Sequence, residues 1–165
     1  MISTQVLREC NLFQGMEETH LKKVAEICRE EAFSAGSTII AEGGEANAFH
    51  IILEGEVAVD VEIPFGPHQP PQKITIQVLR QGEIFGWSTL IESPYYMESV
   101  RCVKDSKFLT LKRSDLRKLM DENLALGYTV MKGVANIIAS RLKHIRSRLA
   151  VEWGLCTLYD QGVPY

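Results

Sequence analysis

The sequence has no large excess of charge of either sign. It carries 18 lysines and arginines against 21 aspartates and glutamates, a net charge of −3 over 165 residues. This balance gives no overall attraction to nucleic acid or to an anionic membrane. No apolar run approaches the roughly 20 residues of a membrane span, and the N-terminal stretch MISTQVLREC does not have the pattern of a secretory signal. We therefore expect a cytoplasmic protein without membrane insertion.

The sequence also lacks the spacings that mark metal sites, redox motifs and active sites. No two cysteines form a CxxC pair and the histidines are scattered, which favours reduced and mostly buried thiols. No HExxH motif, P-loop or nucleophile–base set is found. We expect no metal, no certain cofactor and no enzymatic activity. The cysteines and histidines are Cys10, Cys28, Cys102, Cys156, His20, His50, His68 and His144.

What the sequence does contain is a helical pattern, then a β-rich middle, then helices again. From Leu21 to Cys28, apolar residues recur at steps of three and four, as in an amphipathic helix. From Phe33 to Leu111, short β-prone runs alternate with glycine-bearing turns, which predicts an antiparallel sandwich or barrel. The strict apolar alternation along Val57–Ile63 indicates a strand with one buried face. Strands are expected near residues 37–40, 49–53, 57–63, 74–78, 99–103 and 107–111, with a proline-rich loop at 64–71.

Helices return after Lys112, and the last of them carries the clearest apolar stripe. Ser114 is a candidate N-cap for a short helix, and a longer helix is expected from about Leu124 to Val151. Its apolar residues step by three and four, close to a heptad seam, and its opposite face is basic. The seam favours a dimer interface, the alternative being that the helix packs entirely on its own domain. The seam residues are Met131, Val134, Ile138, Leu142, Ile145 and Leu149, and the basic residues are Arg141, Lys143, Arg146 and Arg148.

Two stretches together point to a known family. The first, IIAEGGEANAFHIILEG from Ile39 to Gly55, fits the family's spacing of aliphatic residues and turn glycines, although Gly44 and His50 depart from it. On these residues the chain resembles the cyclic nucleotide-binding domain, the sensor module of catabolite activator regulators, cyclic-nucleotide-dependent kinases and gated channels. The matching positions are Ile39, Ile40, Gly43, Ala46, Phe49, Ile51, Ile52 and Gly55.

The resemblance runs from about Leu12 to Leu149 and implies a mainly β, α+β fold. This fold is an antiparallel double-stranded β-helix or jelly-roll β-roll, flanked by an N-terminal helix and C-terminal helices. We expect residues 1–123 to form the first helix, the β-roll and a short following helix, residues 124–151 a dimerisation helix, and residues 152–165 a tail.

The second stretch, GEIFGWSTLIESPYYMES from Gly82 to Ser99, resembles the family's phosphate-binding cassette. Phe85 and Gly86 fit, and Ser88, Thr89 and Leu90 are close to the pattern. The family's glutamate, which takes the ribose 2′-hydroxyl, is replaced by Trp87, and its arginine, which pairs with the cyclic phosphate, by Glu98. The resemblance implies a ligand site at Phe85, Gly86, Trp87, Ser88, Thr89, Leu90, Glu98 and Ser99.

These two replacements are expected to weaken the binding of cyclic nucleotides. Removing one partner of such an ion pair costs about 3–5 kcal/mol, which corresponds to at least a few hundredfold in affinity. Trp87 either fills the vacant cradle as core or, with Tyr95 and Tyr96, walls a remodelled pocket. Glu98 is either a solvated carboxylate, or one paired with a nearby arginine such as Arg101, or it acts as a switch residue or as the partner of a cationic ligand.

We therefore expect a non-catalytic regulatory or sensor module, homodimeric through its last helix, that does not bind cAMP or cGMP in the usual mode. One alternative is a binder of a cyclic nucleotide or other small anion through altered contacts. Another is a ligand-free dimeric scaffold in signalling or transcription regulation. The downstream partner would be an unknown effector protein. Direct DNA binding is not expected, because only 14 residues follow Val151, too few for the helix-turn-helix domain of the family's DNA-binding members.

Overall fold

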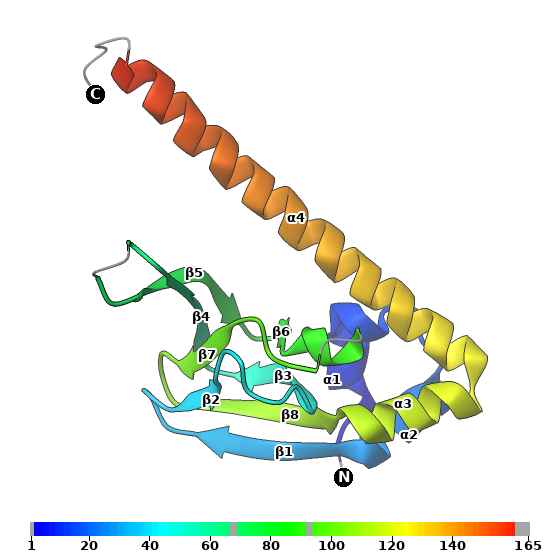
Figure 1. Cartoon of the computed structure of the whole chain (residues 1–165). Helices are drawn as coiled ribbons and strands as arrows, with labels where there is room; N and C mark the ends of the chain where they lie inside the picture. The colour runs from blue at the N-terminus through cyan, green and yellow to red at the C-terminus, as the bar shows by residue number, and fades with distance from the viewer. Residues whose placement is uncertain (1, 67–68, 92–93, 161–165) are drawn as a thin grey trace.

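The computed structural model describes residues 2–66, 69–91 and 94–160; at residues 152 and 155–160 it describes the helical backbone alone. Figure 1 shows a β-roll with helices gathered at one end and one long helix crossing beside it. Within the described residues, no helix combines the length and the apolar character of a membrane span.

The β-roll consists of two four-stranded antiparallel sheets. The first has the order β1 (Cys28–Phe33), β8 (Ser106–Lys112), β3 (Ala48–Glu54), β6 (Ile84–Phe85), and the second β2 (Thr38–Ile40), β7 (Ser99–Cys102), β4 (Glu56–Ile63), β5 (Gln72–Arg80). Strands far apart in the chain are thus neighbours, as in a jelly roll. The expected mainly β fold with flanking helices is confirmed.

The interior of the β-roll is apolar and follows the alternation seen in the sequence. Val57 and Val59 point into it with 0% exposure, whereas Ile63, at the far end of the same strand, is 38% exposed. The register shifts between Val59 and Asp60, where β4 pairs with β5. The alternation therefore predicts a buried face correctly only for the first half of β4. The interior residues are Ile40, Ile52, Val57, Val59, Leu79, Phe85, Val100, Cys102 and Phe108.

A second core lies where the helices cover the end of the β-roll (Figure 1). It joins α1 (Thr4–Glu9), the short helix η1 (Asn11–Phe13), α2 (Glu18–Ile27), α3 (Arg113–Glu122) and the first half of α4 (Leu124–Asp160). Gly133 lets α4 approach η1 closely, since a Cβ there would lie 2.2 Å from the carbonyl oxygen of Leu12. The buried side chains of these elements include Leu7, Leu12, Phe13, Leu21, Val24, Leu116, Leu126, Val130 and Val134.

The last helix is longer than the sequence predicts. It begins beside Asn123, whose side-chain oxygen accepts a hydrogen bond from the backbone N–H of Leu126 at 3.0 Å. It then continues past Val151 to Asp160, so the expected tail is helical over 152–160, and residues 161–165 lie outside the described residues. The apolar pattern does not predict this extension, because Gly154 interrupts the pattern. A single glycine, however, costs a helix only about 1 kcal/mol relative to alanine.

The predicted seam on α4 consists of one buried residue and five exposed ones. Val134 is 2% exposed and belongs to the core of its own chain, because it lies where α4 still packs on the helices and the β-roll. The prediction of Val134 as an interface residue is therefore wrong, because its side chain is already buried within its own chain. The other seam residues are partly to largely exposed: Met131 42%, Ile138 38%, Leu142 65%, Ile145 53% and Leu149 49%.

Candidate functional site

The predicted cassette keeps its backbone frame. Strand β6 ends at Phe85, Gly86 takes a left-handed conformation with φ 73°, and the short helix η2 (Trp87–Leu90) follows. A Cβ at Gly86 would approach the carbonyl oxygen of Ala48 and the side chain of Ile40 to 3.0 Å. Glycine is therefore required here both for the turn and for the close contact with β3.

Four of the predicted site residues line one small pocket. Its volume is about 160 Å³, whereas pockets for small molecules usually measure about 300–1,000 Å³. Trp87 is half-buried in the pocket wall and packs against the helical core, so its indole occupies part of the cassette. The lining residues are Ile40, Gly86, Trp87, Ser88, Tyr96, Met97, Glu98 and Val100.

The other predicted site residues lie elsewhere. Phe85 is in the roll interior, stacked on the His50 ring at a centroid distance of 4.7 Å. The hydroxyl of Ser99 accepts a hydrogen bond from the backbone N–H of Glu42 at 3.0 Å. Thr89 and Leu90 line a separate cavity of about 420 Å³, next to Arg113 and Arg117 of α3.

The hydroxyl of Thr89 stands out within this cassette. Its Oγ1 is buried and has no hydrogen-bond partner within the described part of the chain. A buried polar atom of this kind loses the hydrogen bonds that water would offer, at a cost of about 1–3 kcal/mol. Thr89 therefore retains an unused donor and acceptor within the cassette helix η2.

The two tyrosines do not form an aromatic box with Trp87. The Tyr96 hydroxyl donates to the carbonyl oxygen of Ala48 at 2.6 Å and accepts from the Ala48 N–H at 3.2 Å, which fixes it against β3. Burial raises the pKa of Tyr96. Tyr95 is 59% exposed and lines a different cavity. Of the remodelled aromatic pocket that the sequence left open as one alternative, the structure brings Trp87 and Tyr96 to one pocket and leaves Tyr95 outside it.

Glu98 forms an ion pair, but not with the arginine expected from the sequence. Its carboxylate lies 3.6 Å from the guanidinium of Arg141, on α4. Arg101 instead pairs at 2.8 Å with the buried carboxylate of Asp60. The Glu98–Arg101 pair considered from the sequence rests only on the closeness of the two residues along the chain. It does not form, because Arg101 lies on β7 opposite Ala58 of β4.

Arg141 is a candidate site residue that the sequence did not reveal. It was placed on the exposed basic face of the last helix, yet its side chain is only 16% exposed. Its Nη2 donates to the carbonyl oxygen of Ile84 at 3.2 Å, and its guanidinium carbon lies 5.3 Å from the centroid of the Trp87 ring, within cation–π range. Burial lowers the pKa of Arg141, while Glu98 and Glu83 act in the opposite direction.

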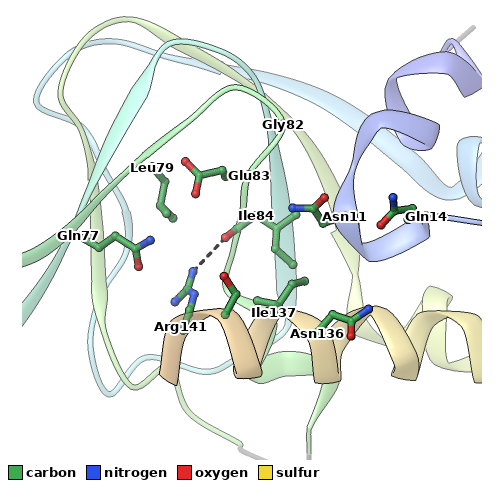
Figure 2. Close-up of a pocket in the computed structure, with 11 residues that line it drawn as sticks. Asn11, Gln14, Gln77, Leu79, Gly82, Glu83, Ile84, Asn136, Ile137 and Arg141 are labelled. Atoms are coloured by element: carbon green, nitrogen blue, oxygen red, sulfur yellow. Dashed lines mark hydrogen bonds between the residues drawn. The ribbon is translucent and has the colours of Figure 1, made fainter. Parts of the chain in front are cut away.

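A larger cavity of about 330 Å³ lies beside Arg141 (Figure 2). Its walls are α4, the turn from Leu79 to Ile84, and residues near η1. Uncharged polar side chains dominate the walls, and Arg141 is already paired with Glu98. Among its described lining residues, this cavity therefore offers a small molecule hydrogen-bonding groups, but no positively charged side chain that is free of an ion pair. It is lined by Asn11, Gln14, Gln77, Leu79, Gly82, Glu83, Ile84, Asn136, Ile137, Ser140 and Arg141.

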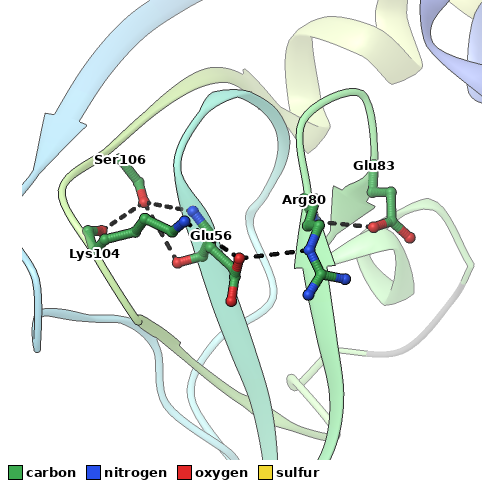
Figure 3. Close-up of polar contacts among 5 residues, drawn as sticks. All are labelled: Glu56, Arg80, Glu83, Lys104 and Ser106. Carbon is green, nitrogen blue, oxygen red and sulfur yellow. Dashed lines mark hydrogen bonds and ion pairs between the residues drawn. The ribbon is translucent and has the colours of Figure 1, made fainter.

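A polar cluster holds the turn that leads into the cassette (Figure 3). The Glu56 carboxylate lies 3.4 Å from both Arg80 and Lys104, and the Glu83 carboxylate accepts the backbone N–H of Arg80 at 2.8 Å. The hydroxyl of Ser106 accepts the Glu56 N–H at 3.2 Å. These contacts tie three strand ends together. No group of metal-ligating side chains gathers anywhere among the residues with described side chains.

The comparisons with known proteins agree with this geometry. The sequence profile of the Cyclic nucleotide-binding domain matches residues 30–123, which include both sheets except the first two residues of β1, and the whole cassette. The chain belongs to the cyclic nucleotide-binding domain family. A candidate cyclic nucleotide-binding protein from Geobacter metallireducens GS-15 is 32% identical, with a TM-score of 0.72 over 86% of this chain and 99% of that one.

Three further matches have a lower sequence identity. The cGMP-dependent protein kinase egl-4 of Caenorhabditis elegans is 28% identical over 80% of this chain, and the Cyclic AMP receptor protein of Thermus thermophilus is 26% identical over 92%. A cyclic nucleotide-binding domain from Methylobacillus flagellatus shares the fold with a TM-score of 0.77 at 21% identity, covering 90% of this chain and 81% of that one. The chain spans only 17% of the kinase and 71% of the Thermus protein.

Proposed function

We propose that this member of the cyclic nucleotide-binding domain family is a non-catalytic regulatory module that does not bind cAMP or cGMP in the usual mode. The observation that carries this proposal is the Glu98–Arg141 ion pair at 3.6 Å beside a pocket of about 160 Å³. The cassette frame is present, but a carboxylate stands where an anionic ligand needs a cation, and Trp87 takes part of the remaining space.

The electrostatics of the cassette support the same conclusion. A cyclic phosphate entering it would meet Glu98 and would have to displace that carboxylate from Arg141. Glu98 is 31% and Arg141 16% exposed, so their pairing is screened less by water and salt than a surface pair is. The anion would therefore gain little net attraction and would lose the ion pair already present.

A second candidate is a small-molecule sensor that uses altered contacts. It is favoured by the cavity of about 330 Å³ beside Arg141 and by the unpartnered hydroxyl of Thr89. The effector would be a cyclic nucleotide held differently, another anion, or a polar neutral molecule. A ligand-free interaction scaffold is the remaining alternative, and the small volume of the cassette pocket favours it.

We further propose that the module is a homodimer through α4 and acts on an effector protein in the cytoplasm, without binding DNA directly. The exposed seam from Met131 to Leu149 supports the dimer. Three described cysteines, Cys10, Cys28 and Cys102, are free and buried, as is usual for proteins of reducing compartments.

The test is to restore the family's two charged residues. In isothermal titration calorimetry, the wild-type chain should show no saturable binding of cAMP or cGMP. The double variant Trp87→Glu with Glu98→Arg should bind at least one of them, because it regains the hydroxyl acceptor and the phosphate cation. Micromolar binding by the wild type would overturn the proposed function in favour of the second candidate, a sensor that holds the nucleotide through altered contacts. A double variant that folds without gaining affinity would contradict the assignment of these positions.

A further inference from the structure

The distal half of α4 is held to the β-roll by two arginines. The apolar attachment of the helix to the core ends at Ile137. From residue 138 to 151, every side chain is exposed except that of Arg141. In this region Arg141 donates a hydrogen bond to the carbonyl oxygen of Ile84 at 3.2 Å, and Arg148 donates one to that of Ile76 at 2.8 Å.

The first of these arginines binds the cassette at three points. Its guanidinium contacts the backbone of Ile84 in β6, the ring of Trp87 in η2, and the carboxylate of Glu98 just before β7. Figure 2 shows Arg141 extending from α4 toward Ile84. Of the three partners, Glu98 alone carries the opposite charge, so it supplies the strongest attraction to Arg141.

We propose that Glu98 acts as a built-in anionic ligand of Arg141, and that this ion pair positions the distal half of α4 on the cassette without a bound effector. The inference rests on the proposed function, namely that the cassette does not hold a cyclic nucleotide in the usual mode. Glu98 and Arg141 are positioning residues in this scheme. They also set specificity, because an incoming anion has to compete with Glu98 for the same guanidinium.

The pair would also couple the cassette to the proposed dimer seam. Arg141 lies between Ile138 and Leu142, and Ile145 follows one helical turn after Leu142. Among the described residues, these exposed apolar side chains belong to neither of the two cores. In this scheme, the position of the seam residues relative to the cassette depends on which group Arg141 binds.

Hydrogen–deuterium exchange of the full chain tests the inference. Glu98→Gln and Arg141→Gln should each increase exchange of the backbone amides in 138–151 by on the order of fivefold, the effect of losing one partly buried ion pair. Glu54→Gln is the matched control, since it removes the exposed pair with Lys107 at 3.2 Å, far from α4 in the fold. This control should leave exchange in 138–151 unchanged.

Charge reversal separates an ion pair from a merely structural role. Glu98→Arg alone should accelerate exchange in 138–151, and adding Arg141→Glu should return it toward the wild-type rate. Wild-type exchange in Glu98→Gln, or equal exchange in the single and double reversals, would overturn the inference. Binding of cAMP or cGMP by the wild-type chain would instead overturn the proposed function, so the two failures are distinguishable.

Discussion

His50 is a buried ionisable residue in the wall of the β-roll, and its neighbours define its protonation. Its ring is 6% exposed and stacks on Phe85, and its Nδ1 lies 2.9 Å from the hydroxyl of Thr110. That hydroxyl donates its single proton to Glu31, so it accepts from Nδ1–H of His50. Burial lowers the pKa of His50 to about 4, with Glu31 opposing the shift.

This shift predicts a loss of stability on acidification. Because the folded-state pKa lies below the ordinary value of 6.5, the neutral ring stabilises the fold fully above pH 6.5. That contribution declines as the pH falls from 6.5 through 4, by about 3 kcal/mol at most. Urea unfolding of the wild type and of His50→Gln should give stabilities that converge over this range. A parallel decline of both proteins would show that other groups are responsible.

The residue scale is also where the sequence was least informative. The identity of the cassette positions followed from the resemblance to the family's cassette, and the structure brings Gly86, Trp87, Ser88 and Glu98 to one pocket. The partner of Glu98 could not be predicted, because Arg141 is 43 positions away and the basic pattern of its helix resembles a solvated face. Only the path of α4 over the cassette brings the two charges together.

At the scale of elements, the sequence predicted the strands bounded by clear turn signals and missed two others, β1 and β6. Strand β1 was missed because its sequence, CREEAF, is rich in helix-forming and charged residues and has five of six positions at least partly exposed. Its pairing with β8 alone fixes it as an edge strand. Strand β6 is too short to show a period. Helix α1 likewise shows no clear period over its six residues.

The contact between η1 and α4 provides an element-scale prediction. Gly133→Ala would place a methyl group 2.2 Å from the carbonyl oxygen of Leu12 and must push the two elements apart. We expect a loss of about 1–3 kcal/mol in stability, despite the better helix propensity of alanine. The measurement is the free energy of unfolding in urea. Gly154→Ala in the same helix is the control, since its Cβ would meet nothing within 4 Å and should cause no loss.

At the scale of the whole molecule, the fold places the cassette, the helical core and the proposed seam along one helix. The first half of α4 is part of the core through Leu126, Val130 and Val134, whereas its second half carries exposed apolar residues. The sequence pattern treated the stripe as continuous, since periodicity cannot show where a helix leaves its own domain. Apart from Met131, the part of the seam that a second copy could cover therefore starts after Val134, further along the helix than the pattern indicates.

This division gives a sharp test of the dimer. Leu142 is 65% exposed, so Leu142→Glu should leave the fold of the single chain intact while placing a charge in the centre of the seam, where an apolar contact between two copies cannot accommodate it. In sedimentation velocity, the wild type should run as a dimer and Leu142→Glu as a monomer, with unchanged circular dichroism. Lys143→Glu, one residue along and outside the seam, should remain dimeric. A monomeric wild type at high concentration would refute the dimer, and a dimeric Leu142→Glu would place the interface on another surface.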